Sequence, residues 1–401
     1  MRSLRSVAAR AGLSGRWGLL LAAVPLTAWL APAAALACPF CGPAESVTRQ
    51  MSMVEAAAVV RATGEPTNPE TRLRPYFVEH VLKGADRLAK NDAGDYLPVR
   101  SFSPTEEPKA EDRYLILGAD DSGELYWSAP LPVNARAVQY LTRELPLAPA
   151  EGVERLRFFV PLLRHEEQFI ADDAYGEFAR TEYDVVQQLR PYLSRKTLRA
   201  WIEDEKTTTA QRRLFLTLLG LCATKDDAGW LRALIPVEQA KEPTDRSLDA
   251  LVACYLTITG EEGLEQVEHE ILKKPDPVFA DVNAVVLALR FHGEQEKVID
   301  RERIAASMRI VLDHPNWVDT VVADLARWKD WSAMDRLVEI YRTADAEHRY
   351  VRVPIVQYMK ACPLPEAKEA LKTLEEIDPQ AVRRASSVFL PFGPGSGGTR
   401  N

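Results

Sequence analysis

A pair of helices between residues 212 and 234 limits the fold of this chain more than any other stretch. Leu214, Leu218 and Leu221 recur at helical spacing, a charged turn follows, and a second short helix carries Trp230. Burying about six to eight such apolar side chains gains roughly 10–20 kcal/mol. Ordering about 35 residues costs roughly 35–70 kcal/mol in backbone entropy. The pair is therefore stable only against stacked neighbours.

The following sequence provides such neighbours. Equivalent turn positions at Ala228, Gly263, Ala333 and Ala367 lie 35, 70 and 34 residues apart. A period near 35 with two helices in each unit is typical of an α-solenoid. The tetratricopeptide and ankyrin signatures are absent, and the units resemble HEAT-type repeats. We therefore expect an α-helical repeat domain over residues 149–385, whose first helices run through residues 214–221, 248–256, 282–289, 318–325 and 351–359.

The N-terminus has the pattern of a signal peptide over residues 1–37. A basic segment from Arg2 to Arg16 precedes an apolar run, and Ala35-Leu36-Ala37 forms a small-x-small cleavage site before Cys38. No later apolar run is long enough to cross a bilayer. The pattern predicts export to the periplasm or the extracellular space. A retained transmembrane anchor and a lipid anchor on Cys38 are the less favoured alternatives.

Length and net charge limit the number of domains and the kind of partner that the chain can bind. The 401 residues allow two or three domains. Residues 1–37 carry four arginines and no acid, so their removal changes the net charge from −8 to −12. Such acidity argues against nucleic-acid binding, which depends on lysine and arginine to displace counterions from phosphates. We expect a protein partner and no nucleic acid.

Five cysteines fall into two groups. Cys38 and Cys41 form a C-x-x-C motif at the mature N-terminus, where no strand precedes them. The favoured interpretation is a local structural disulfide in an oxidising compartment, and the alternatives are redox chemistry, metal binding or a free thiol pair. The other three lie on apolar helical faces and are predicted to be buried thiols, a Cys222–Cys254 bridge being the alternative; they are Cys222, Cys254 and Cys362.

Residues 38–148 predict a small β domain, either a barrel or a sandwich. Short strands are expected over residues 56–60, 74–82, 96–102, 114–117 and 124–127, the last two forming a hairpin. An N-terminal Cys pair, the run Ala56 to Val60, the strand end at Val81-Leu82-Lys83-Gly84 and the strand Arg113 to Leu117 together resemble netrin-like domains, which include the tissue inhibitors of metalloproteinases. The resemblance implies an OB-type barrel and protease inhibition through a mature N-terminal cysteine. The C-x-x-C spacing departs from that pattern, and no functional residue is transferred.

No stretch carries a complete catalytic motif. The densest titratable cluster is His165-Glu166-Glu167 with Asp172, Asp173 and Glu177, in which Asp173 and Glu177 share a helical face. The cluster lacks the second histidine of H-E-x-x-H, and a solvated acidic surface is the favoured interpretation. Neither a phosphate-binding loop nor a G-x-S-x-G motif occurs.

Together these patterns predict an α+β multidomain protein, an OB-like barrel or sandwich followed by a HEAT-like solenoid, with a Gly- and Pro-rich tail over residues 386–401. The expected function is non-enzymatic: an exported scaffold that presents a helical surface to a protein partner and holds no cofactor or metal. The alternatives are thiol-disulfide or metal handling through Cys38 and Cys41, and protease inhibition.

Overall fold

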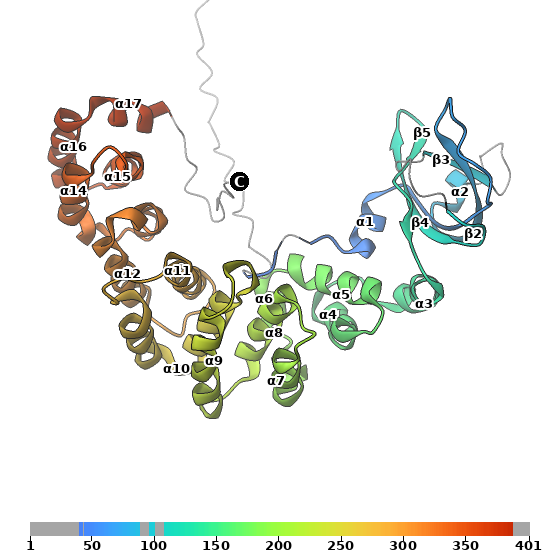
Figure 1. Cartoon of the computed structure of the whole chain (residues 1–401), viewed down its shortest axis with the longest axis horizontal. Coiled ribbons are helices and arrows are strands. Elements are labelled where there is room, and N and C mark those ends of the chain that lie inside the picture. The colour runs from blue at the N-terminus through green and yellow to red at the C-terminus, as the bar shows by residue number, and fades with distance from the viewer. Residues whose placement is uncertain (1–39, 43, 89–95, 101–107, 388–401) are drawn as a thin grey trace, which may run out of the picture. The chain divides into compact units, whose positions relative to one another are not determined.

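The computed structural model describes residues 40–42, 44–88, 96–100 and 108–387, which all fall within one unit of the chain, residues 35–401. The predicted signal peptide, Cys38 and the tail from residue 388 onward lie outside the described residues. The fold class is α+β: a nearly closed antiparallel barrel-like sheet over residues 56–132 precedes a long series of helices (Figure 1).

The described part of the sheet has the strand order β3-β2-β1-β4-β5, and a sixth short strand pairs with β4. All of these pairs are antiparallel. All five predicted strands are present and start within one residue of their expected starts. The strands are β1 (Ala56–Ala62), β2 (Leu73–Lys83), β3 (Tyr96–Arg100), β4 (Arg113–Asp121), β5 (Glu124–Trp127) and β6 (Leu131–Pro132).

Strand β1 is apolar along its length because both of its faces are covered. Ala58 and Val60 belong to the core inside the barrel. Val59, between them, packs in the separate core that continues into the helices. Side chains alternate between the faces of a strand, so a strand buried on both sides needs the continuous apolar run that begins at Ala56.

The β4–β5 hairpin turns where the sequence predicts. Ser122 and Gly123 both have positive φ, 58° and 97°, as a two-residue type I′ turn requires. The Gly123 amide donates to Asp120 Oδ1 at 3.0 Å, and this bond holds the turn closed.

Helix α1 (Val47–Met53) precedes the barrel and is tied to the end of β2. Lys83 Nζ donates to the carbonyls of Met51 at 3.0 Å and Ser52 at 2.8 Å. A lysine at the last carbonyls of a helix satisfies acceptors that have no partner within the helix and matches the negative end of its dipole. The next residue, Gly84, has φ 73°, and a Cβ there would lie 2.3 Å from the carbonyl oxygen of Glu55. The Lys83-Gly84 pair therefore holds α1 against the barrel.

The chain becomes helical at Ala135, before the expected start of the helical domain at residue 149. The segment from Tyr140 to Leu147 continues as a π-helix and a 3-10 turn. The α-helices that follow the barrel are α3 (Ala135–Gln139), α4 (Gly152–Phe159), α5 (Gln168–Arg180), α6 (Tyr183–Gln187), α7 (Arg195–Glu203), α8 (Thr209–Cys222), α9 (Ala228–Gln239), α10 (Leu248–Val267), α11 (Phe279–Glu294), α12 (Arg301–Ile310), α13 (Val322–Arg327), α14 (Met334–Thr343), α15 (Arg352–Ala361), α16 (Pro365–Ile377) and α17 (Pro379–Ser387).

Several helices that the sequence predicts to begin successive units pack on one another. Helix α10 contacts both α8 and α11, and α15 contacts both α13 and α17. The second helix of the first predicted unit is α9, and that of the next unit is the C-terminal half of α10. Gly260 (φ 62°, ψ −140°) separates this half from the N-terminal half of α10. Four of the five predicted first helices are present as α-helices, whereas the one expected over residues 318–325 is a 3-10 segment up to Thr320 and an α-helix only from Val322.

Buried ion pairs link these helices at a constant separation. Arg213 pairs with Asp249 at 3.0 Å and Arg290 with Asp324 at 2.7 Å, across 36 and 34 residues. Arg246 reaches Asp281 across 35 residues. Each carboxylate is almost fully buried and depends on its arginine, and in the case of Asp324 also on Arg327, to compensate its charge. The repeat period of the sequence is therefore also the spacing of these charge contacts.

The three cysteines of the helical part carry free thiols, so the alternative of a Cys222–Cys254 bridge is wrong. Cys254 and Cys362 are buried as predicted, whereas Cys222 is half-buried. Burial raises the pKa of the Cys254 thiol, which keeps it protonated. In the described residues, no helix is both long and apolar enough for a membrane span.

Candidate functional site

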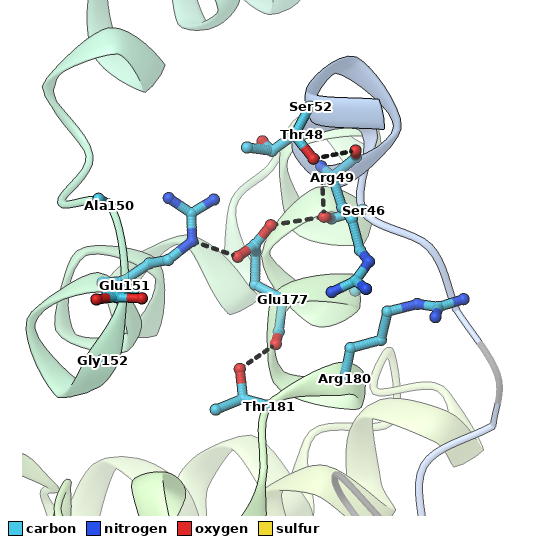
Figure 2. Close-up of a pocket in the computed structure, with 12 residues that line it drawn as sticks. Ser46, Thr48, Arg49, Ser52, Ala150, Glu151, Gly152, Glu177, Arg180 and Thr181 are labelled. Atoms are coloured by element: carbon cyan, nitrogen blue, oxygen red, sulfur yellow. Dashed lines mark hydrogen bonds and ion pairs between the residues drawn. The ribbon is translucent and has the colours of Figure 1, made fainter. Parts of the chain in front are cut away.

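A cavity of about 400 Å³ lies where α1 meets α4 and α5 (Figure 2). Its walls come from three parts of the chain that are distant in sequence, and polar or charged side chains predominate. The lining residues are Ser46, Thr48, Arg49, Ser52, Ala150, Glu151, Gly152, Arg155, Gly176, Glu177, Arg180 and Thr181.

Local chemistry starts α1 at this point. The Ser46 hydroxyl accepts a hydrogen bond from the backbone amide of Arg49 at 3.0 Å, which makes Ser46 the N-cap. Ser46 also lies directly on α5, because a Cβ at Gly176 would be 2.5 Å from the Ser46 nitrogen. Only glycine at position 176 allows the two backbones to approach this closely.

Asp173, one turn before Gly176, is the buried anchor of this contact. It accepts from the Thr48 amide at 3.0 Å, the Thr48 hydroxyl at 2.7 Å and the Tyr140 hydroxyl at 2.6 Å. Its side chain is 1% exposed. Burial raises the pKa of Asp173, and the hydrogen bonds from Tyr140 and Thr48 oppose that change. Burial and the neighbouring carboxylate also raise the pKa of Tyr140.

Glu177 forms the second connection and faces the cavity. The Ser46 hydroxyl donates to Glu177 Oε1 at 2.5 Å, and Arg155 Nε donates to Oε2 at 2.6 Å. Arg155 also donates to the carbonyl of Pro149 at 2.8 Å. One carboxylate thus joins α1, α4 and α5, and its charge is compensated by Arg155.

Arg49 and Arg180 line the cavity beside this carboxylate (Figure 2). Arg180 donates from Nε to the carbonyl of Ala44 at 2.9 Å and forms an exposed ion pair with Glu45. The side chain of Arg49 makes no hydrogen bond or ion pair with any described residue. Three guanidinium groups from α1, α4 and α5 therefore border one cavity.

The structure corrects the interpretation of the acidic cluster. Asp173 and Glu177 do share a helical face, but that face is covered by α1 and is not a solvated surface. Asp172 is exposed and bonded to Gln168. His165 lies outside the cavity, where its Nδ1 accepts from the amide of Glu167 at 2.9 Å. Glu166 and Glu167 do not line the cavity either.

Of the C-x-x-C motif, only Cys41 and Phe40 are described, and Cys38 lies outside the described residues. Phe40 is 6% exposed and packs edge-to-face on Phe291 at 5.2 Å between ring centroids. Cys41 packs against the same core. Residues 40 and 41 are therefore anchored on the helical part, and the Cys38–Cys41 disulfide stays a prediction.

Within the described residues, no group of three or more histidine, cysteine, aspartate or glutamate side chains is arranged to hold a metal ion. The polar groups of the cavity are arginines, hydroxyls and carboxylates. Its hydroxyl–carboxylate pair, Ser46 with Glu177, is engaged in capping α1 and in binding Arg155, and the set as a whole suits ionic and hydrogen-bonded recognition.

Sequence reasoning missed Ser46, Arg155 and Gly176. The sequence does contain one signal for Gly176. A glycine inside a helix, three residues after Asp173 and directly before Glu177, indicates that another backbone approaches the helix there. The position of Arg155 one helix earlier carries no comparable signal. No protein-family model, curated protein or solved structure matches the chain.

Proposed function

We propose that this chain is an exported, non-enzymatic binding protein that presents the surface of an α-solenoid to a protein partner. The proposed solenoid is HEAT-like, and the Arg–Asp contacts at separations of 34–36 residues support it. Such contacts between successive units favour a stiff, continuous surface, as repeat proteins use for recognition. The proposed barrel is OB-type, and a small, nearly closed antiparallel sheet with five strands in one continuous path supports it, since that fold is a five-stranded, partly open barrel.

The observation that carries the proposal is an exposed aromatic surface shared by successive units. Phe279 begins α11, is 48% exposed and packs on Trp317 at 5.7 Å between ring centroids. Trp317 lies in the 3-10 segment Pro315–Thr320, which contacts the 3-10 segment Arg349–Val351 with the 42%-exposed Tyr350. Aromatic side chains are enriched in protein interfaces and supply much of their binding energy.

Photo-crosslinking tests the proposal. A crosslinking amino acid at position 279 of the full-length chain, expressed in its exporting cell, should capture one envelope protein reproducibly. The same probe at Tyr126, which is 58% exposed on the barrel, is the matched control. Phe279→Ala combined with Tyr350→Ala should weaken binding of the purified partner at least tenfold, since central aromatic anchors cost about 2 kcal/mol or more on truncation, about thirtyfold.

Two results would contradict the proposal. Equal capture from both positions would show that the aromatic surface has no special part. Turnover of substrates by the purified protein, abolished by a single substitution, would show that the protein is an enzyme.

A further inference from the structure

The cavity between α1, α4 and α5 has a charge arrangement that its internal contacts leave incomplete. Three arginines and two glutamates line it. Glu177 is already compensated by Arg155 at 2.6 Å and by the Ser46 hydroxyl. Arg49 has no described partner, so its guanidinium is available to a ligand.

Arg180 is also available in part. Its ion pair with Glu45 is exposed on both sides, with 36% and 45% of the side chains accessible. Exposed pairs of this kind contribute little, and a ligand with a higher negative charge can compete with Glu45. Its bond from Nε to the carbonyl of Ala44 fixes the direction of the guanidinium.

The hydroxyl groups of the cavity already donate to backbone carbonyls or to carboxylates, so the arginines are the main hydrogen-bond donors left for a ligand. The hydroxyl of Ser52 donates to the carbonyl of Arg49 at 2.6 Å, and that of Thr181 to the carbonyl of Glu177 at 2.7 Å. At the start of α4, Glu151 forms no side-chain cap. Gly152 has φ 77° and open space where a Cβ would stand. The first turn of α4 therefore borders the cavity at Gly152 with no side-chain cap, and the positive end of the helix dipole adds to the potential of the guanidiniums.

We propose that this cavity binds an oxyanion of the phosphate class, held by Arg49 and Arg180 with support from Arg155. Guanidinium groups bind phosphate oxygens through paired, charge-assisted hydrogen bonds. A volume of about 400 Å³ exceeds that of bare phosphate and lies within the range of small-molecule sites, about 300–1,000 Å³. The ligand class is thus a small phosphorylated molecule, and inorganic phosphate is its minimal probe. This inference does not depend on the helical surface proposed above.

The position of the site gives binding a structural consequence. Arg49 belongs to α1, Arg155 to α4 and Arg180 to α5, so an anion that contacts all three draws α1 onto the helices. Ligands that bind only the assembled form stabilise it by mass action. Bound phosphate should therefore slow hydrogen exchange in α1.

Calorimetric titration of the mature chain tests the site with inorganic phosphate, glycerol phosphate and succinate, all at constant ionic strength. We expect both phosphate probes to bind, and glycerol phosphate to bind more tightly because the cavity has room for its carbon chain. Arg49→Gln and Arg180→Gln should each weaken phosphate binding about tenfold or more, the effect of losing a charge-assisted hydrogen bond. Since Arg49 is exposed and has no described partner, its replacement should leave the unfolding midpoint unchanged.

Arg157→Gln is the matched control. Arg157 lies on the same helix as Arg155, pairs with Glu154 and does not line the cavity. An equal loss of binding in this variant would reduce the effect to general surface charge and overturn the proposal. Binding that is unchanged in Arg49→Gln, or tighter binding of succinate than of either phosphate probe, would overturn it as well.

Discussion

Gly176→Ala should release α1 from the helical part. The added methyl would lie 2.5 Å from the Ser46 nitrogen and 2.8 Å from its Cα, whereas ordinary contacts begin at 3.4 Å. One backbone must therefore move by about 0.9 Å. A shift of that size takes the Thr48 amide, now 3.0 Å from Asp173, out of hydrogen-bond range.

The free-energy change can be separated into two parts. Overpacking at a tight contact costs about 1–3 kcal/mol, and alanine gains about 0.8–1.0 kcal/mol over glycine within a helix. The gain is present whether α1 is docked or not, because α5 remains helical in both states. Only the overpacking acts on the docking equilibrium. The fraction of molecules with α1 undocked should consequently rise about 5- to 150-fold, at tenfold for each 1.4 kcal/mol.

Hydrogen exchange followed by mass spectrometry measures this fraction in peptides covering residues 44–55. Exchange there should accelerate by the same factor, while α8 and α10 remain as protected as in the unmodified protein. Gly229→Ala is the matched control, since Gly229 lies in α9 and the added methyl would have no neighbouring atom within 4 Å. The control should raise overall stability by up to about 1 kcal/mol and leave α1 unchanged. If α1 exchanges as slowly in Gly176→Ala as in the unmodified protein, the close contact between Gly176 and Ser46 is refuted.

Three further outcomes follow from the same contacts. Burial raises the pKa of Asp173, so the Asp173 carboxyl stays protonated to higher pH in the folded protein than in the unfolded chain. The stability contributed by the protonated carboxyl is therefore lost as the pH rises through the raised pKa. Asp173→Asn cannot ionise, and its stability relative to the unmodified protein should therefore increase in urea titrations as the pH rises above the ordinary carboxyl range; a flat or falling difference would contradict the direction of the shift. Asp324→Ala should destabilise the protein more than Glu154→Ala, because it removes the buried carboxylate that Arg290 and Arg327 share, and a hydrogen bond to a charged group contributes about 1.5–3 kcal/mol, whereas Glu154 belongs to an exposed pair; similar urea midpoints would show that the interhelical pairs contribute little. Iodoacetamide treatment of the denatured, unreduced chain should modify three cysteines and spare Cys38 and Cys41 if they form the predicted disulfide, whereas five modified cysteines would exclude it.

Local features of the fold were predictable because they depend on neighbouring residues. Strand β5 has the expected bounds, 124–127, and the turn before it lies at the predicted Ser122-Gly123. The first helices follow from apolar spacing alone, as at Leu214 and Leu218 in α8. Each of these depends on the periodicity of a short window, which side-chain geometry determines directly.

The cavity was not predictable because its contacts are long-range. Ser46 and Glu177 are 131 residues apart, and Thr48 and Asp173 are 125 apart. Helical periodicity placed both acids on one face of α5 but contained nothing about what covers that face. A buried carboxylate and a solvated one have the same local pattern, and the difference lies in the donors that the fold supplies.

Helix α1 is held at both ends by different parts of the molecule, and this gives the cavity its structural importance. At its C-terminal end Lys83 of β2 donates to the last carbonyls of α1, and at its N-terminal end Ser46 and Thr48 are bound to α5. A displacement of α1 from α5 must therefore either break the bonds to Lys83 or move with the barrel. Because a proposed ligand at Arg49 would act on this same helix, binding and the barrel contact are thermodynamically linked. Lys83→Met should therefore weaken phosphate binding, and the loss of affinity measures the coupling between the two ends of α1. An unchanged affinity would show that the two ends act independently.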